Sequence, residues 1–303
     1  MKNRIYIFLV LFCTSTAVFA QQRPQYTQYI FNNYLLNPAL SGIENYVDFK
    51  AGHRKQWAGI NNAPLTTFAS AHWNLGSDYL WKNPLSLPEN GEDPMSRNYM
   101  QNYTASPSHH GMGTTIVLDK VGPISRLDAN LTYAYHLQLS GTWNMSVGVA
   151  AGFSNIRLDV NALTLENPND PALSNAIVSQ FKPDLAMGVW LYGPRFFAGA
   201  SAQQILPQNL AFTTDPNYSQ GKQVAHIFVT AGYKFFIDEN ISVVPSFMIK
   251  HTNPVPVSFD TNLKLSFKDL VWVGGSYRHN ESHSALFGVN VSKLAVSYTH
   301  LRA

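Results

Sequence analysis

The sequence predicts an all-β protein: a transmembrane β-barrel of the outer membrane, with about 14 antiparallel strands in the intact chain. Three observations indicate this fold. Apolar and polar residues alternate along many segments of about ten residues, as in strands whose two faces meet different surroundings. Charged residues make up 13 % of the 303 residues, about half the share usual for a soluble domain. Beyond the first twenty residues, no apolar run approaches the roughly 18 residues that a membrane-spanning helix needs.

The N-terminus carries the features of an export signal. Lys2 and Arg4 precede an apolar stretch, Ile5–Phe12, and Val18–Ala20 supplies a small-x-small pattern for cleavage. We therefore predict a Sec signal peptide at residues 1–20. Export through such a signal is also what an outer-membrane protein requires.

The mature chain is expected to contain no cysteine. The sequence has one cysteine, Cys13, which lies inside the predicted signal and follows a bulky residue, whereas a lipoprotein signal has a small residue there. We expect neither a lipid anchor nor a disulfide framework. Removing the signal leaves basic and acidic residues nearly equal in number, so no nucleic-acid partner is expected.

Strands are predicted from residue 46 onward. In 127–139 every second residue from Leu127 to Leu139 is apolar, and the residues between them are mostly polar. Segment 257–267 repeats this pattern. We therefore expect about twelve strands before the C-terminal fragment. The other alternating segments lie near 46–56, 65–76, 111–119, 143–157, 184–192, 195–205, 224–236, 241–250, 270–278 and 284–291.

The connections between these strands alternate in length. Tight turns, expected on the periplasmic side, lie at 140–142, 193–194, 238–240, 268–269 and 292–293. Longer connections rich in Asn, Pro and Gly, expected on the outer side, lie at 57–64, 120–125, 158–183, 206–223, 251–255 and 279–283. Such segregation is typical of outer-membrane barrels. Residues 77–110 break the rule and are predicted to be a periplasmic insertion.

The domain organisation follows from these elements. An N-terminal periplasmic or plug segment, 21–45, precedes the barrel, 46–296. Residues 297–303 are expected to be a non-native tail, because they resemble translated sequencing-adapter sequence. Since bacterial barrels have an even number of strands, we predict a truncated gene model whose last strand or strands are missing.

No catalytic motif is present. The sequence lacks the P-loop, His-Glu-x-x-His, Cys-x-x-Cys and Gly-x-Ser-x-Gly patterns. The histidines at 109–110 and at 251, 279 and 283 have no carboxylate at ligand spacing, so solvated loop histidines are expected rather than a metal site. We predict a non-enzymatic protein without a catalytic residue, metal or cofactor.

The most informative segment is 26–76. Asn37-Pro38-Ala39-x-Ser41-Gly42 predicts a turn that redirects the chain, because Pro fixes φ and Gly permits positive φ. Arg54 is costly in contact with lipid and is expected to face the lumen. Gly148 and Gly152 lie in a strand pattern and are also expected to face it. The favoured interpretation is a structural plug contact.

These residues resemble the PorP/SprF family of type IX secretion membrane proteins, found in the Bacteroidota. The resemblance is most specific at the N-terminal block and extends to about residue 296. The motif residues that carry it, and that are candidates for docking or plug contacts, are Tyr26, Gln28, Tyr29, Asn37, Pro38, Ala39, Gly42, Arg54, Gln56, Trp57, Gly59, Ala63, Pro64, Asp119, Gly122 and Pro123.

The resemblance implies a non-enzymatic barrel that serves secretion or surface anchoring of cargo with a C-terminal sorting domain, including adhesins and gliding-motility proteins. The implied partners are the type IX translocon and motor-ring components, this cargo, a peptidoglycan-binding lipoprotein and the lipid bilayer. Two alternatives remain open from the residues alone. One is an outer-membrane porin or hydrophobic-compound channel, and the other is a soluble secreted β-sandwich adhesin, whose strands also alternate.

Overall fold

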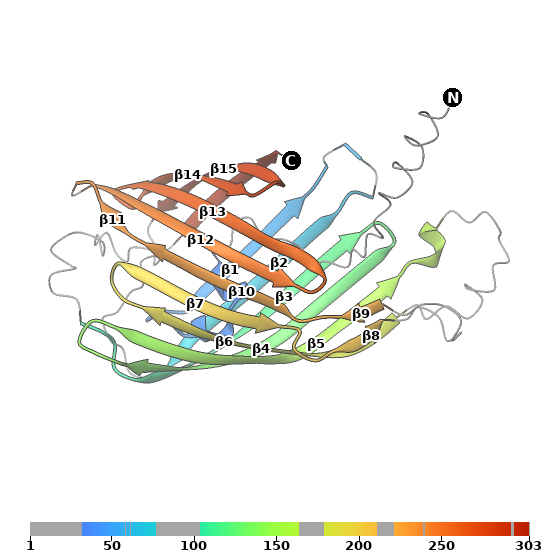
Figure 1. The fold of residues 1–303 in the computed structure, drawn as a ribbon, viewed down its shortest axis with the longest axis horizontal. Coiled ribbons are helices and arrows are strands. Elements are labelled where there is room, and N and C mark those ends of the chain that lie inside the picture. Colours follow the sequence, from blue (N-terminus) through green and yellow to red (C-terminus); the bar gives the residue numbers. More distant parts are fainter. Residues whose placement is uncertain are drawn as a thin grey trace, which may run out of the picture.

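The computed structural model describes residues 32–57, 59–60, 62–76, 104–163, 179–210, 221–238, 240–291 and 294–302. In these ranges the regular structure is β-strand with three short 3-10 helices, η2 (Asn33–Leu35), η3 (Pro38–Leu40) and η4 (Val160–Ala162) (Figure 1). No helix in this part of the chain is long and apolar enough to cross a membrane.

Fourteen strands form a single antiparallel sheet in which each long strand pairs with its neighbours in the sequence. They are β1 (Asp48–Lys55), β2 (Leu65–Leu75), β3 (His109–Val121), β4 (Ile124–Gln138), β5 (Asn144–Leu158), β6 (Ser179–Tyr192), β7 (Phe196–Gln203), β10 (His226–Tyr233), β11 (Phe235–Phe236), β12 (Ile241–Thr252), β13 (Val255–Phe267), β14 (Val271–Arg278), β15 (Ser282–Val291) and β16 (Leu294–Arg302). The strands β8 (Gln208–Leu210) and β9 (Gly221–Gln223) pair separately.

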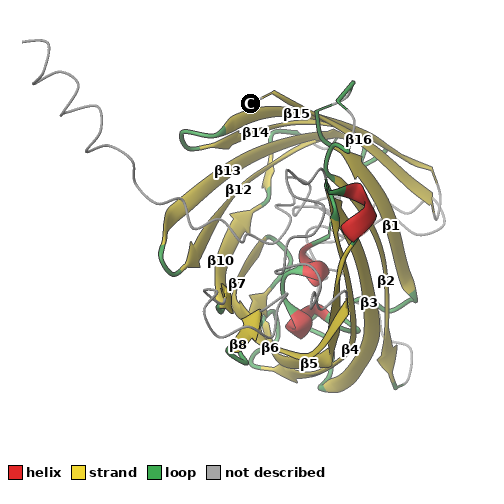
Figure 2. Ribbon diagram, turned by 90° about the vertical axis from the view of Figure 1, so that its right-hand side faces the viewer, coloured by secondary structure: helices red, strands yellow, loops and turns green. Residues whose placement is uncertain are grey.

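The sheet curls into an open ring, as Figure 2 shows, and among the described residues it is not closed into a barrel. Among the described residues, β1 pairs only with β2, and β16 pairs only with β15. The predicted all-antiparallel architecture is therefore confirmed in part: the order of strands is as expected, whereas closure is not observed.

Several boundaries differ from the predicted ones. β6 begins at Ser179, inside the expected outer loop 158–183, and its first residue pairs with Arg157 of β5. β8 and β9 form a short ladder inside the expected loop 206–223. β16 pairs with β15 through residues 294–302, so most of the expected non-native tail continues the sheet.

The two faces of the sheet have inverted chemistry compared with a soluble protein. On β4, Leu131 is 68 % exposed on the outer, convex face, whereas its neighbour Thr132 is 4 % exposed on the inner, concave face. The same alternation continues in the other long strands, with exposed Leu, Val, Phe and Tyr outside and buried Ser, Thr, Asn and His inside. An apolar outer band with a polar interior is typical of membrane-spanning sheets.

The apolar core lies between the N-terminal residues and the concave face. Tyr34, Leu40 and Ile43 cluster with residues of the concave face of the sheet, here called the wall, that include Trp190 and Phe197. A second cluster joins Leu36 to Phe228 of β10 and Met248 of β12. The N-terminal residues are therefore part of the folded core.

Candidate functional site

Residues 32–43, here called the inner segment, cross the space enclosed by the sheet. The two 3-10 helices η2 and η3 belong to this segment, and η3 contacts β4, β5 and β6. Side-chain bonds and apolar contacts reach the concave face from β2 at one side to β12 at the other. Figure 2 shows helical turns, in red, inside the ring of strands.

The predicted turn at 37–42 is formed, and each of its special residues has a structural reason. Asn37 caps η3, because its Oδ1 accepts a hydrogen bond of 3.0 Å from the backbone N–H of Ala39. Pro38 opens the helix, where its missing N–H costs nothing. Gly42 ends the turn with φ of +70°, which favours glycine.

The wall binds the backbone of the inner segment through polar side chains. Ser146 donates to Ala39 O at 2.6 Å, and Ser201 donates to Leu36 O at 2.7 Å. The Asn37 amide donates in the other direction, to the carbonyl of Val189 at 3.0 Å. Buried backbone carbonyls without partners are costly, so these side chains stabilise a non-strand segment inside the sheet.

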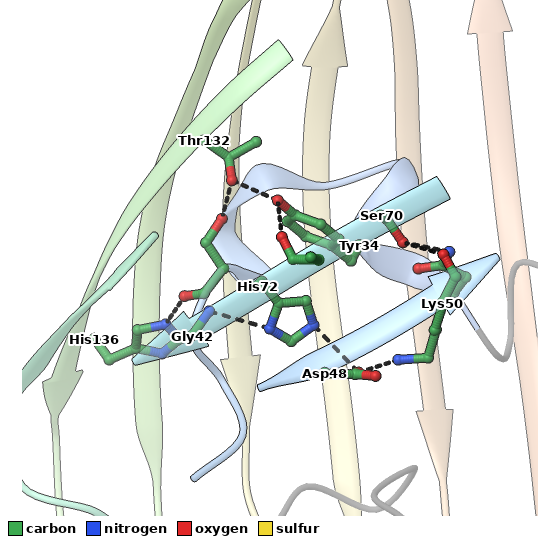
Figure 3. A network of polar contacts seen from close by, with 11 residues as sticks. Tyr34, Gly42, Asp48, Lys50, Ser70, His72, Thr132 and His136 are labelled. Atoms are coloured by element: carbon green, nitrogen blue, oxygen red, sulfur yellow. Dashed lines mark hydrogen bonds and ion pairs between the residues drawn. The ribbon is translucent and has the colours of Figure 1, made fainter. Parts of the chain in front are cut away.

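Tyr34 connects η2 to β4. Its Oη lies 2.6 Å from Thr132 Oγ1, and its ring meets the ring of His72 edge-on, with centroids 4.6 Å apart (Figure 3). Burial raises the pKa of Tyr34 to about 12, while its hydrogen bond with Thr132 acts in the opposite direction. The phenol is therefore neutral at physiological pH and can serve as a donor.

Two histidines hold the Ser41-Gly42 end of the turn. His72 Nδ1 accepts from the N–H of Gly42 at 3.3 Å, and its Nε2 lies 3.3 Å from Asp48 Oδ2 (Figure 3). His136 Nε2 lies 2.8 Å from Ser41 O, which can only accept, so this nitrogen carries the proton. Its Nδ1 lies 2.8 Å from the Tyr192 hydroxyl. Asp48 also pairs with Lys50.

The wall is lined with glycine where the inner segment comes closest. A Cβ added to Gly148 would lie 2.5 Å from the Cα of Ala39. Cβ atoms added at Gly111 and Gly188 would collide with atoms of the segment as well. We call Gly111, Gly148 and Gly188 the glycine seat. Gly148 thus faces inward, as expected, and its lack of a side chain makes room for the inner segment.

Arg54 and Asp119 lie on the concave face near the end of the strands that carries the β1–β2 loop, away from the Ser41-Gly42 turn. Arg54 is half-buried and faces Thr66 across the β1–β2 ladder, and Thr66 donates to Asp119 Oδ1 at 2.6 Å. Asp119 faces Arg126 on β4, and Arg54 acts on the Asp119 carboxylate electrostatically. The expectation that Arg54 faces inward, where charge can be satisfied, agrees with this placement.

The remaining motif residues form two turns at the same end of the strands. Gln56 N–H donates to Pro64 O at 3.0 Å and closes the β1–β2 loop. Trp57 is 64 % exposed with φ of +46°, and Gly59 has φ of +99°. In the same loop Ala63 is half-buried, and Gly122 and Pro123 form the β3–β4 turn, Gly122 with φ of +57°.

The sequence-predicted site residues therefore separate into an inner-segment group and a turn group. Tyr26, Gln28 and Tyr29 lie outside the described residues. The wall residues that bind the segment were not singled out from the sequence: Thr132, His136, Ser146, Ser201 and Gln203. Their only signal is a polar residue in the inward phase of an alternating strand, which many other positions share.

The polar groups of this site bind another part of the same chain. Its donors and acceptors are directed at a segment of the same chain, and its charged groups are paired or placed along the wall. Within the described ranges, no three His, Cys, Asp or Glu side chains gather as a metal site would require.

A family model described as type IX secretion system membrane protein PorP/SprF matches residues 18–301, nearly the whole chain. No curated protein matches the chain.

Proposed function

The chain belongs to the PorP/SprF family of type IX secretion system membrane proteins, and from this premise we propose that it is a non-enzymatic outer-membrane component of that system. In this role it supports the secretion or surface anchoring of cargo that carries a C-terminal sorting domain, of the adhesin or gliding type. Residues 1–20 direct its export, and residues 21–45 form a plug in the barrel.

The observation that carries the proposal is the inverted chemistry of the sheet. Exposed apolar residues lie on the convex face of β3 to β6, β10 and β12 to β15, while polar residues are buried on the concave face. Water would make such a convex face prone to aggregation, whereas lipid is a suitable solvent for it.

A membrane-spanning sheet cannot keep unpaired edges in lipid, since backbone groups there have no water to bond. The unpaired edges of β1 and β16 are therefore proposed to be joined in the membrane by further strand pairing, which gives a barrel of about 14 strands. Residues 104–108, the described part of the predicted insertion 77–110 that precedes β3, lie at the end of the strands opposite Trp57, which is proposed to be the periplasmic mouth. Residues 77–103 lie outside the described residues.

Docking is proposed at the outer mouth. The β1–β2 loop presents exposed Trp57 and Ile60. Next to this loop, Arg54 and Thr66 face each other across β1 and β2, and Thr66 donates a hydrogen bond to Asp119 of β3. Exposed aromatic residues are preferred anchors at protein interfaces. The proposed partners at this mouth are translocon components and the cargo. Motor-ring components and a peptidoglycan-binding lipoprotein are proposed to meet the opposite, periplasmic mouth.

Deletion of the gene, followed by comparison of the outer-membrane and secreted proteomes, tests this function. We expect the loss of one or a few large secreted proteins with C-terminal sorting domains, restored by the wild-type gene. Replacing Trp57 by alanine in the restored gene should reduce that secretion while the barrel stays in carbonate-washed membranes. Unchanged cargo together with altered solute uptake would contradict the secretion role and favour a channel.

A further inference from the structure

A short strap of residues precedes β3 and lies beneath the inner segment. The N–H of Ala105 donates to Gly141 O at 2.8 Å, in the turn between β4 and β5. Asn144 Nδ2 donates to Ser106 O at 2.8 Å, and Gln138 Nε2 donates to Ala105 O at 3.2 Å. Residues 104–108, here called the strap, are therefore fixed to the turn end of β4 and β5.

The strap also packs against the inner segment. Ala105 belongs to the same apolar cluster as Leu40 and Ile43 of the N-terminal residues. Both Ala105 and Ser106 are buried. The strap thus covers the inner segment from the predicted periplasmic side of the sheet.

His109 connects the strap to the inner segment. His109 directly follows the strap in the chain, and its Nε2 lies 3.2 Å from Gly42 O in the inner segment, while its Nδ1 lies 2.9 Å from Pro107 O. Both oxygens can only accept, so the neutral ring donates to one of them at a time, and donation to Gly42 O connects the strap to the inner segment. The ring stacks on that of His136, with centroids 4.4 Å apart and planes at 5°. His109 was expected to be a solvated loop histidine, which is wrong: it is buried at the start of β3.

We propose that His109 and the strap form a latch that keeps the inner segment across the lumen, so that the protein holds its own pore shut. The inner segment crosses from β2 to β12, where hydrogen bonds to wall side chains and the two apolar clusters hold it. Replacing His109 removes the hydrogen bond to Gly42 O that connects the strap to the turn of the inner segment. The inference rests on the proposed membrane barrel.

Single-channel recording in planar bilayers tests the latch with the full mature chain. The H109A variant loses the bridge, and we expect its pore to open on the order of tenfold more often than the wild type. H110A is the matched control, because His110 is the next residue of β3 and contacts Tyr133 on the convex face. H110A should conduct like the wild type.

A disulfide between inner segment and wall shows whether movement of the segment opens the pore. Ser41 Oγ and Thr132 Oγ1 lie 2.8 Å apart, close enough for the pair S41C/T132C to bridge. The sequence contains no cysteine besides Cys13, so this pair would be the only disulfide of the mature chain. With H109A added, the oxidised protein should stay closed and the reduced protein should open.

Three results would overturn the latch: equal opening of H109A and H110A, equal opening of the oxidised and reduced triple variant, or no insertion into bilayers even by the wild type. The last result would also contradict the proposed barrel, whereas the first two leave it intact. If H109A does not assemble, H109L replaces it, because leucine fills similar space without a hydrogen-bonding group. H109L should open more often than the wild type, and closure equal to the wild type would again overturn the latch.

Discussion

Replacing Gly148 by leucine will expel the inner segment from the wall. Even a single added carbon at this position lies 2.5 Å from backbone atoms of Pro38 and Ala39. These backbone atoms cannot rotate away as the end of a flexible side chain can. On the other side, β5 and its neighbours pack against η3 and cannot move back. Overpacking of this kind costs about 1–3 kcal/mol or more, which exceeds the net contribution of about 1 kcal/mol from any single hydrogen bond that holds the segment.

Limited proteolysis of the folded protein in detergent measures this change. We expect cleavage within residues 32–43 of G148L under conditions that leave the wild type intact. G275L is the control, since Gly275 lies in β14 with no atom within 4 Å of an added Cβ. Equal protection of the segment in G148L and G275L would show that the glycine seat does not hold it.

Replacing Arg278 by leucine will give the largest loss of stability among single substitutions of charged wall residues. Arg278 and Asp260 are direct partners across β13 and β14, joined by two hydrogen bonds of 2.7 Å. Both side chains are buried, with 7 % and 3 % exposed. Removing one member leaves a buried charge without its partner, at a cost of about 3–5 kcal/mol.

Heat-modified migration in gels and thermal unfolding in detergent measure that loss. R157L is the control, because Arg157 bonds Asn155 at an exposed site of β5, where substitutions change stability by about 0.5 kcal/mol or less. The double variant D260L/R278L should recover much of the stability, since it removes both charges together. Similar unfolding of R278L and R157L would contradict the structural role of the pair.

The strands were predictable because their signal is local. The alternation over 127–139 identifies β4 within a few residues of its observed bounds, Ile124–Gln138. The start of β6 was missed, since Lys182 and Pro183 interrupt the pattern there. That stretch becomes a strand through pairing with β5, a contact that the sequence of β6 alone does not contain.

Of the two parts of the site, only the turn of the inner segment could be predicted from the sequence. Asn37, Pro38 and Gly42 have turn chemistry that can be read locally, so the turn was expected. Its partners could not be read in this way. Ser146 and Ser201 are ordinary inward-facing residues until the inner segment is placed beside them, more than 100 residues from their position in the chain. The same reason explains why the buried bridging role of His109 was missed.

The central claim is that the convex face meets lipid while the concave face encloses the chain's own N-terminal segment. A nitroxide scan of single cysteines along β4 in reconstituted membranes tests it most directly. We predict high accessibility to oxygen and low accessibility to a water-soluble reagent at 131, 133 and 135, and low accessibility to both at 132, 134 and 136. Access of the water-soluble reagent to 131, 133 and 135, or the absence of a period of two, would contradict the claim.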